Sequence, residues 1–223
     1  MAGVLYIVYT QSIMRTIPVI NCTNAPCFKK KLADLAAFLP DTSPIHVDIA
    51  KKPFASINTF PGYHIVKSYQ HTYHFAAHCM VPMAAIMKGS WFGSAYEMLY
   101  FHYHAVHDWE KVVEKARANH QKIGVVFDRG DSLKDIRMPK GVHYALVLAV
   151  HPGKAHQKFH AQAIRIITLL KKEYPHVTIT VDGGITPEVA RLVKTAGADM
   201  VVSSSYIWNA EQTQRAYNKL ASI

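Results

Sequence analysis

Short apolar runs rich in Val, Ile and Tyr alternate with helix-favouring stretches from end to end of the chain, and this alternation limits the possible folds most. The expected strands are residues 4–9, 44–50, 73–81, 98–106, 122–127, 143–150, 177–182 and 200–205. Without a composition break or a Gly/Ser linker, this order predicts one α/β domain over residues 1–223, a (β/α)8 TIM barrel. An open doubly wound sheet is the alternative, and the second and fifth helical connections look short.

Local signals mark several of the expected helices. Residues 27–39 have apolar side chains at helical spacing, and residues 155–175 end at a proline. Asp108 is a good N-cap for a helix that follows it. Thr186 as N-cap and Gly197 as C-cap bound another helix.

The net charge and the cysteine content indicate which binding partners and which cellular compartment to expect. The 223-residue chain has a formal net charge of +10, which favours anionic partners such as phosphorylated metabolites. It has no Arg-rich segment and no long apolar span, so we expect neither nucleic acid nor a membrane as partner. Cys22, Cys27 and Cys79 are odd in number and form no C-x-x-C pair, which favours reduced thiols and a cytoplasmic protein. The N-terminal apolar run lacks a preceding basic region, so we interpret it as a strand rather than a signal peptide.

Ionisable residues lie at or near the ends of three expected strands. His46 and Asp48 are two residues apart, so both point to one face of their strand. His78 lies near the end of the next strand, and Asp182 ends the seventh. In a barrel these four side chains can converge at the mouth, where two imidazoles and two carboxylates suit Zn²⁺ or Fe²⁺. Two carboxylates beside a metal also suit proton transfer next to a carbonyl group. The alternative for His46 and Asp48 is a hydrogen-bonded structural pair.

Most of the 14 histidines have no such pattern. His102 and His104 share the face of an expected strand and resemble a metal-binding pair, although His102 can instead line the barrel interior. His71 and His74 precede the third strand proper and are expected at the surface.

Turns after the last strands are candidates for phosphate binding. Glycines occur in residues 151–157 and 182–185, and Ser204 and Ser205 follow the eighth strand. Loops after strands 7 and 8 are the usual phosphate site of a TIM barrel. Ordinary turn chemistry is the alternative explanation, and for the serines the two explanations weigh equally.

Several motifs in their order resemble the ribulose-phosphate 3-epimerase family. They are "QSIM", "HVDIAKKPF", "FAAHCMV", "ALVLAVHPGKAHQKF" and "VDGGITPEVARLVKTAGADMVVSSSYI". The resemblance spans nearly the whole chain. The last motif is shared by several phosphate-binding barrels, whereas His-x-Asp on strand 2 with His-x-Met after strand 3 is more specific.

The resemblance implies an isomerase of carbohydrate metabolism that acts on a pentose phosphate. The implied metal ligands are His46, Asp48, His78 and Asp182, with Zn²⁺ as the first choice and Fe²⁺, Mn²⁺ or Co²⁺ as alternatives. Asp48 and Asp182 would be the catalytic acid/base pair, acting on opposite faces of the substrate's C3. The implied substrate-binding residues are Ser12, His78, Met80, Gly153, Lys154, Ala155, His156, Gly183, Gly184, Ser204 and Ser205. The family also implies a homo-oligomer.

The chain departs from the family's pattern around the substrate. Ala50 and Leu148 stand where shielding methionines are usual, and Lys51-Lys52-Pro53 replaces Asp-Gly-x. Residues 154–156 replace a Phe and two glycines, and Ser204 stands where Gly is usual. Lys51 and Lys154 could offer positive charge to an anionic ligand.

The sequence therefore predicts a metal-dependent ketose-phosphate 3-epimerase of the ribulose 5-phosphate/xylulose 5-phosphate type, working by two-carboxylate 1,1-proton transfer through an enediolate. One alternative is a related epimerase on another phosphosugar, such as a hexulose phosphate. A non-catalytic sugar-phosphate-binding barrel is the other.

Overall fold

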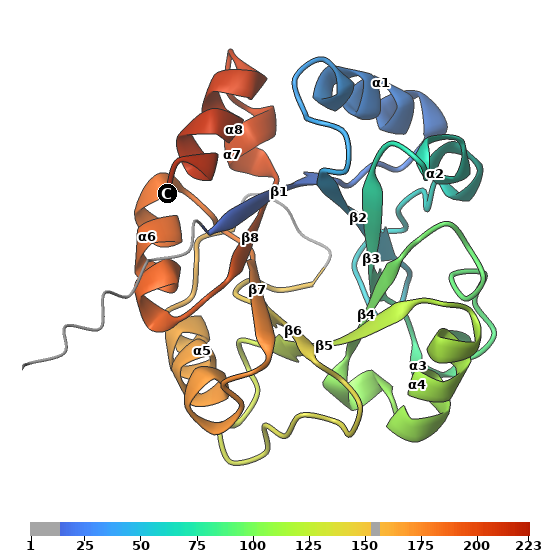
Figure 1. The fold of residues 1–223 in the computed structure, drawn as a ribbon. Helices are drawn as coiled ribbons and strands as arrows, with labels where there is room; N and C mark the ends of the chain where they lie inside the picture. The colour runs from blue at the N-terminus through green and yellow to red at the C-terminus, as the bar shows by residue number, and fades with distance from the viewer. Residues whose placement is uncertain (1–13, 153–156) are drawn as a thin grey trace, which may run out of the picture.

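The computed structural model describes residues 14–152 and 157–223, which form a closed barrel of eight parallel strands (Figure 1). The strands are β1 (Arg15–Ile20), β2 (Pro44–Ala50), β3 (His74–Met80), β4 (Met98–His102), β5 (Lys122–Asp128), β6 (Tyr144–Leu148), β7 (Thr178–Asp182) and β8 (Met200–Ser203). Because β1 pairs in parallel with both β2 and β8, the sheet has no free edge. The predicted TIM barrel is confirmed and the open-sheet alternative is wrong.

Helices surround this barrel unevenly. They are α1 (Ala25–Ala36), α2 (Tyr63–Tyr69), α3 (Met83–Ile86), α4 (Trp109–Ala118), α5 (Gln162–Glu173), α6 (Pro187–Ala196), α7 (Ser205–Trp208) and α8 (Thr213–Ala221), with a 3₁₀ turn, η1 (Tyr103–Ala105), after β4. The second connection has only the two-turn α2, and residues 129–143, between β5 and β6, contain no helix. In the two connections whose helices looked short in the sequence, one helix is short and the other is absent.

Several element boundaries differ from the sequence-based expectation, and two of the differences are large. The expected first strand, 4–9, lies outside the described residues, and the barrel begins instead with β1, whose Pro18 weakens the strand pattern. The helix expected from residue 155 begins only at Gln162. Residues 157–160 are not helical but are held against the segment after β6: the Gln157 side chain bonds to the main chain of His151, and the His160 amide donates to the Ala149 carbonyl at 3.1 Å.

Alternation along the strands separates two environments. On β2, Ile45, Val47 and Ile49 are fully buried and pack in the large core cluster between barrel and helices. Between them, His46 is also buried but belongs to the opposite face, toward the barrel axis. On this strand the barrel interior therefore receives the polar side chains, and the outer face is apolar.

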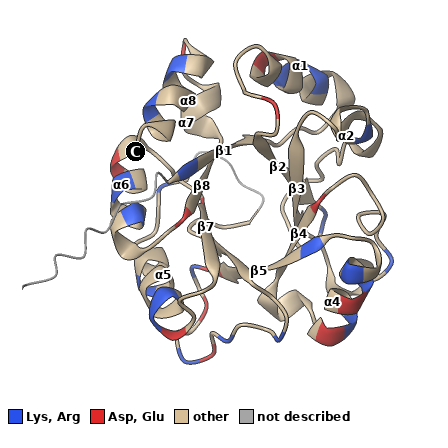
Figure 2. Cartoon of the chain, in the orientation of Figure 1, with Lys and Arg blue, Asp and Glu red and all other residues tan. Residues whose placement is uncertain are grey.

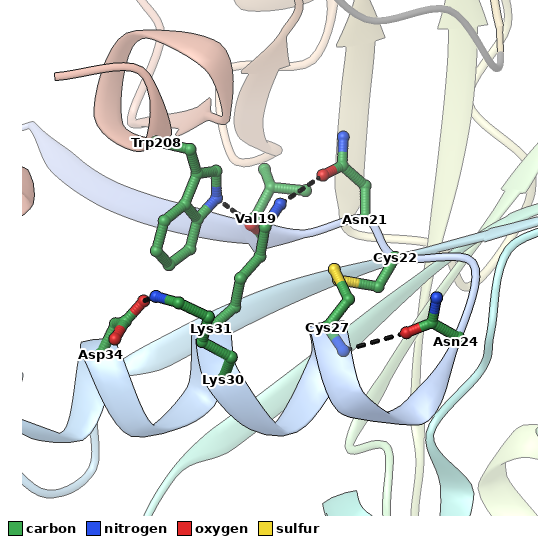
Figure 3. Close-up of a disulfide and its surroundings, with 9 residues drawn as sticks. All are labelled: Val19, Asn21, Cys22, Asn24, Cys27, Lys30, Lys31, Asp34 and Trp208. Carbon is green, nitrogen blue, oxygen red and sulfur yellow. Dashed lines mark hydrogen bonds and ion pairs between the residues drawn. A yellow bond between two sulfur atoms is a disulfide. The ribbon is translucent and has the colours of Figure 1, made fainter.

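A disulfide joins Cys22 and Cys27 where β1 runs into α1 (Figure 3). The expectation that both are reduced thiols is wrong for the described structure. Asn24 caps α1 by accepting a hydrogen bond from the Cys27 amide at 3.0 Å, and this turn brings the Cα atoms of the two cysteines within 5.7 Å. An odd cysteine count does not exclude such a local pair, and Cys79 remains a free, buried thiol.

Many of the charged residues belong to the outer helices, as the colours of α1, α4, α5 and α6 in Figure 2 show. Within the described residues, no helix combines the length and apolarity needed to cross a membrane.

Candidate active site and metal centre

Four ionisable side chains from three strands meet inside the barrel mouth. His46 and Asp48 come from β2, and the parallel register places Asp48 beside His78 of β3. Asp182 ends β7, on the other side of the barrel. One potential ligand atom from each of these four residues lies within 4.8 Å of all the others.

The distances inside this group are longer than good hydrogen bonds. The Asp48 Oδ1 atom lies 3.4 Å from His46 Nε2 and 3.4 Å from His78 Nδ1. The His78 Nδ1 atom is 3.8 Å from Asp182 Oδ2. Among the described residues, His46 Nε2, Asp48 Oδ1 and His78 Nδ1 are buried atoms without a hydrogen-bond partner. Such atoms are costly unless something binds them, and a divalent cation fits this set of two imidazoles and two carboxylates.

Burial and neighbouring charges drive the two carboxyl groups in opposite directions. Burial raises the pKa of Asp48, but the nearby imidazoles of His46 and His78 outweigh it, and the net shift is downward. Burial and then the charge of Asp48 raise the pKa of Asp182 to about 7. Burial also lowers the pKa of His78 to about 4, so its imidazole is neutral near pH 7. Two carboxyl groups with separated pKa values are the usual arrangement of an acid/base pair.

A cavity of about 330 Å³ opens above this group. Asp48, His78 and Asp182 line its floor, whereas His46 is buried and does not line the cavity. The other predicted site residues that line it are Met80, Gly183, Gly184, Ser204 and Ser205. Gly183 and Gly184 have φ values of +105° and +67°, which only glycine adopts readily. The structure thus brings the described members of the predicted site to one cavity.

The remaining predicted site residues cannot be placed. Ser12 and residues 153–156, which comprise Gly153, Lys154, Ala155 and His156, lie outside the described residues. Lys51, which could have offered charge to an anionic ligand, is exposed and does not line the cavity.

The residues at the altered family positions do face the cavity. Ala50 and Leu148 both contribute to its lining and are buried. Their side chains are shorter than methionine, so the walls at these two points are set further back.

His102 and His104 do not form a ligand pair. β4 ends at His102, and the chain then enters η1, so the shared strand face that the pattern predicted is lost. The His102 ring is buried beside His78, with the two Nε2 atoms 3.0 Å apart. The His104 side chain is 65% exposed and bonds to Asp131. The expected interior position of His102 is confirmed. The expected surface position of His74 is also confirmed, because His74 is exposed and bonds to Glu97 at 2.6 Å.

Several residues that line the cavity were not among the predicted site residues; they include Asn21, Thr23, Thr59, His151 and Gln157. A signal existed for Gln157, because the family's usual loop after strand 6 contains a glutamine at the matching place. Thr59 had no such signal. Its hydroxyl donates to the Asp48 carbonyl at 2.5 Å and accepts from the Ala50 amide at 2.8 Å, a bridge between β2 and the following loop.

Comparisons with known proteins agree with this site. Residues 22–208 match the ribulose-phosphate 3 epimerase family. Ribulose-phosphate 3-epimerase of Schizosaccharomyces pombe is 24% identical over 183 residues, which cover 79% of both chains. The cytoplasmic isoform of rice is 29% identical over 117 residues, 50% of this chain and 51% of that protein, so the match spans about half of the relative.

Solved structures support the fold alone. A 3-hexulose-6-phosphate synthase superposes with a TM-score of 0.67 at 14% identity, covering 93% of this chain and 98% of the other. The 3-hexulose-6-phosphate synthase from Salmonella typhimurium gives the same TM-score at 15% identity, over 93% and 97% of the two chains.

Proposed function

The chain belongs to the ribulose-phosphate 3-epimerase family, and from that membership we propose that it is a metal-dependent ketose-phosphate 3-epimerase interconverting ribulose 5-phosphate and xylulose 5-phosphate. The observation that carries the proposal is the pair Asp48 and Asp182. Both line one cavity, and their pKa values are shifted in opposite directions. In the metal-free protein, the Asp48 carboxylate can therefore accept a proton, and Asp182, with its raised pKa, can donate one.

The proposed substrate position follows from the lining. Gly183, Gly184, Ser204 and Ser205 would bind the phosphate through main-chain amides and hydroxyl groups. The sugar carbons would then lie over the floor, with C3 between Asp48 and Asp182. Met80, which is buried at the cavity wall, would keep water from the reacting carbon.

The proton steps belong to the two carboxyl groups. Asp48 would remove the C3 proton from one face, and Asp182 would deliver a proton to the opposite face. In the reverse direction the roles exchange. A divalent cation held by His46, Asp48, His78 and Asp182 would stabilise the negative charge of the enediolate. We propose Zn²⁺ as this cation, and elemental analysis of the purified protein would distinguish it from Fe²⁺, Mn²⁺ and Co²⁺.

Solvent exchange at C3 tests the proposal. The protein is incubated with ribulose 5-phosphate in D₂O, and deuterium at C3 and formation of xylulose 5-phosphate are followed by NMR. Asp48→Asn and Asp182→Asn should each lower the rate by about 10²–10⁴-fold, the usual contribution of a positioned acid or base. Asp34→Asn is the matched control, because Asp34 lies on α1, pairs with Lys30 at 2.7 Å and does not line the cavity. Full activity in Asp48→Asn would refute the proposal.

Ala50 and Leu148, whose side chains are shorter than methionine, leave more room in the cavity. This favours a second candidate function, an epimerase for a larger ketose phosphate such as a hexulose phosphate. A panel of pentulose and hexulose phosphates separates the two, because a higher kcat/KM for a hexulose phosphate would replace the first proposal. Binding of these sugars without C3 exchange would instead indicate the third possibility, a non-catalytic sugar-phosphate-binding barrel.

We further propose a cytoplasmic homo-oligomer that folds as one domain over residues 1–223. The rice relative is named a cytoplasmic isoform, whereas the Cys22–Cys27 disulfide is more typical of an oxidising compartment. Cell fractionation tests the location, light scattering the oligomeric state, and a single cooperative unfolding transition the domain count.

A further inference from the structure

A chain of hydrogen bonds runs from His78 away from the cavity, through three consecutive strands. His78 of β3 faces His102 of β4, with 3.0 Å between their Nε2 atoms. His102 Nδ1 lies 2.9 Å from Asp128 Oδ2 at the end of β5. These strands are neighbours in the barrel (Figure 1), and both histidine side chains are almost fully buried.

The chemistry of the three groups determines where the hydrogens lie. An ionised Asp128 can only accept, so the His102 Nδ1 atom carries a hydrogen and donates it. The Nε2 atom of a neutral His102 is then an acceptor. The opposing Nε2 atom of His78 must therefore carry a hydrogen, and its Nδ1 atom is left with a free lone pair. That Nδ1 atom points at the carboxylates of Asp48 and Asp182, at 3.4 and 3.8 Å.

We propose that Asp128 and His102 are positioning residues, which hold His78 in the tautomer with hydrogen on Nε2 so that its Nδ1 atom can bind a divalent cation. The inference rests on the proposed metal-dependent function, and it assigns a purpose to two residues outside the four ligands. Histidine ligands usually donate their second N–H to a partner that fixes the ring. Here that partner is a second histidine, itself oriented by a carboxylate.

Further contacts hold these two residues in place. The rings of Phe54 and His102 pack at an interplanar angle of 62°, with 4.7 Å between ring centres. The Asp128 amide donates to Asp131 Oδ2 at 2.8 Å, and Asp131 also bonds to His104 at 3.1 Å. Rotation of the His102 ring is therefore opposed on two sides, which a positioning role requires.

Zn²⁺ affinity of His102 variants tests the proposal, measured by competition with a chromogenic chelator. His102→Phe keeps a flat ring but removes the acceptor for His78, and it should weaken Zn²⁺ binding by about 10–100-fold. His102→Gln restores an amide oxygen that can accept and an amide group that can donate to Asp128, so it should recover most of the affinity. Asp128→Ala should weaken binding in the same range. The control is His74→Phe, which removes an exposed histidine–carboxylate pair at the start of β3 and should leave affinity unchanged.

The tautomers give a readout independent of activity and of any variant's folding. In ¹⁵N NMR of the metal-free wild-type protein, His78 should carry hydrogen on Nε2 and His102 on Nδ1. Hydrogen on Nδ1 of His78 would overturn the proposal, and so would unchanged Zn²⁺ affinity in folded His102→Phe. A wild-type protein that binds Zn²⁺ tightly but catalyses no C3 exchange would refute the proposed function and leave this inference standing. Epimerase activity combined with equal Zn²⁺ affinity in all variants would refute the inference alone.

Discussion

Two described glycines, Gly183 and Gly184, line the cavity. Replacement of Gly184 by alanine should disturb the proposed phosphate site more than the same replacement at Gly183. Gly184 has a φ of +67°, and a Cβ atom built there would lie 2.4 Å from the main-chain nitrogen of Phe159. Ordinary contacts begin at 3.4 Å, so the two segments must separate by about 1 Å. The obstacle is main chain, which cannot rotate away as a side chain could.

Two costs add in this variant. Placing a Cβ in the left-handed region costs about 1–2 kcal/mol. Overpacking against a rigid neighbour costs about 1–3 kcal/mol. Gly184→Ala should therefore lower the free energy of unfolding by about 2–5 kcal/mol. It should also raise KM for the sugar phosphate more than it lowers kcat, because Gly184 lines the proposed phosphate site and carries no proton-transferring group.

Urea unfolding and steady-state kinetics measure both effects. Gly130→Ala is the matched control, since a Cβ at Gly130 meets no atom within 4 Å and its φ is not positive. We expect that control within about 0.5 kcal/mol of wild type. Equal stability and equal KM for the two variants would refute the argument from close approach.

Three other changes test separate features. Reducing the Cys22–Cys27 disulfide, or Cys27→Ser, should cost about 2 kcal/mol of stability by the loop-entropy relation for so short a loop, measured by urea unfolding with and without dithiothreitol; no difference between the two conditions would mean that the bond does not form in solution. Thr59→Val should lower the free energy of unfolding by about 1–3 kcal/mol, because the buried Ala50 amide loses its acceptor. A loss below about 0.5 kcal/mol would show that water replaces the hydroxyl. In metal-free protein, the raised pKa of Asp182, about 7, means that the folded state retains a proton that the unfolded state has released, so stability falls as pH rises from about 4 to 7. Asp182→Asn lacks this dependence, and its stability relative to wild type should grow across that pH range in denaturation curves recorded with chelator; a constant difference would contradict the shift.

Local patterns predicted some elements well. The alternation of residues 44–50 matches β2 residue for residue, because its outer side chains must all be apolar to pack under helices. Thr186 and Gly197 bound α6 as expected, since the Thr186 hydroxyl caps Val189 and Gly197 adopts a φ of +106°. These signals act over a few residues and need no knowledge of the rest of the chain.

Other features depended on contacts that a linear pattern does not contain. The disulfide arose from the turn after β1, and the exposed position of His104 from the early end of β4. Asp128 carried no signal at all, because its partner His102 lies 26 residues away and meets it only through the pairing of β4 with β5.

The sequence by itself determined the barrel and the strand ends that carry ionisable groups, because hydrophobic periodicity and capping are local properties. It also indicated His46, Asp48, His78 and Asp182 as one candidate group. Only the tertiary structure decided that their ligand atoms lie within 4.8 Å and that His102 and Asp128 stand behind His78. Closure of the barrel brings side chains that face its axis together whatever their separation in sequence, and strand register decides which of them touch.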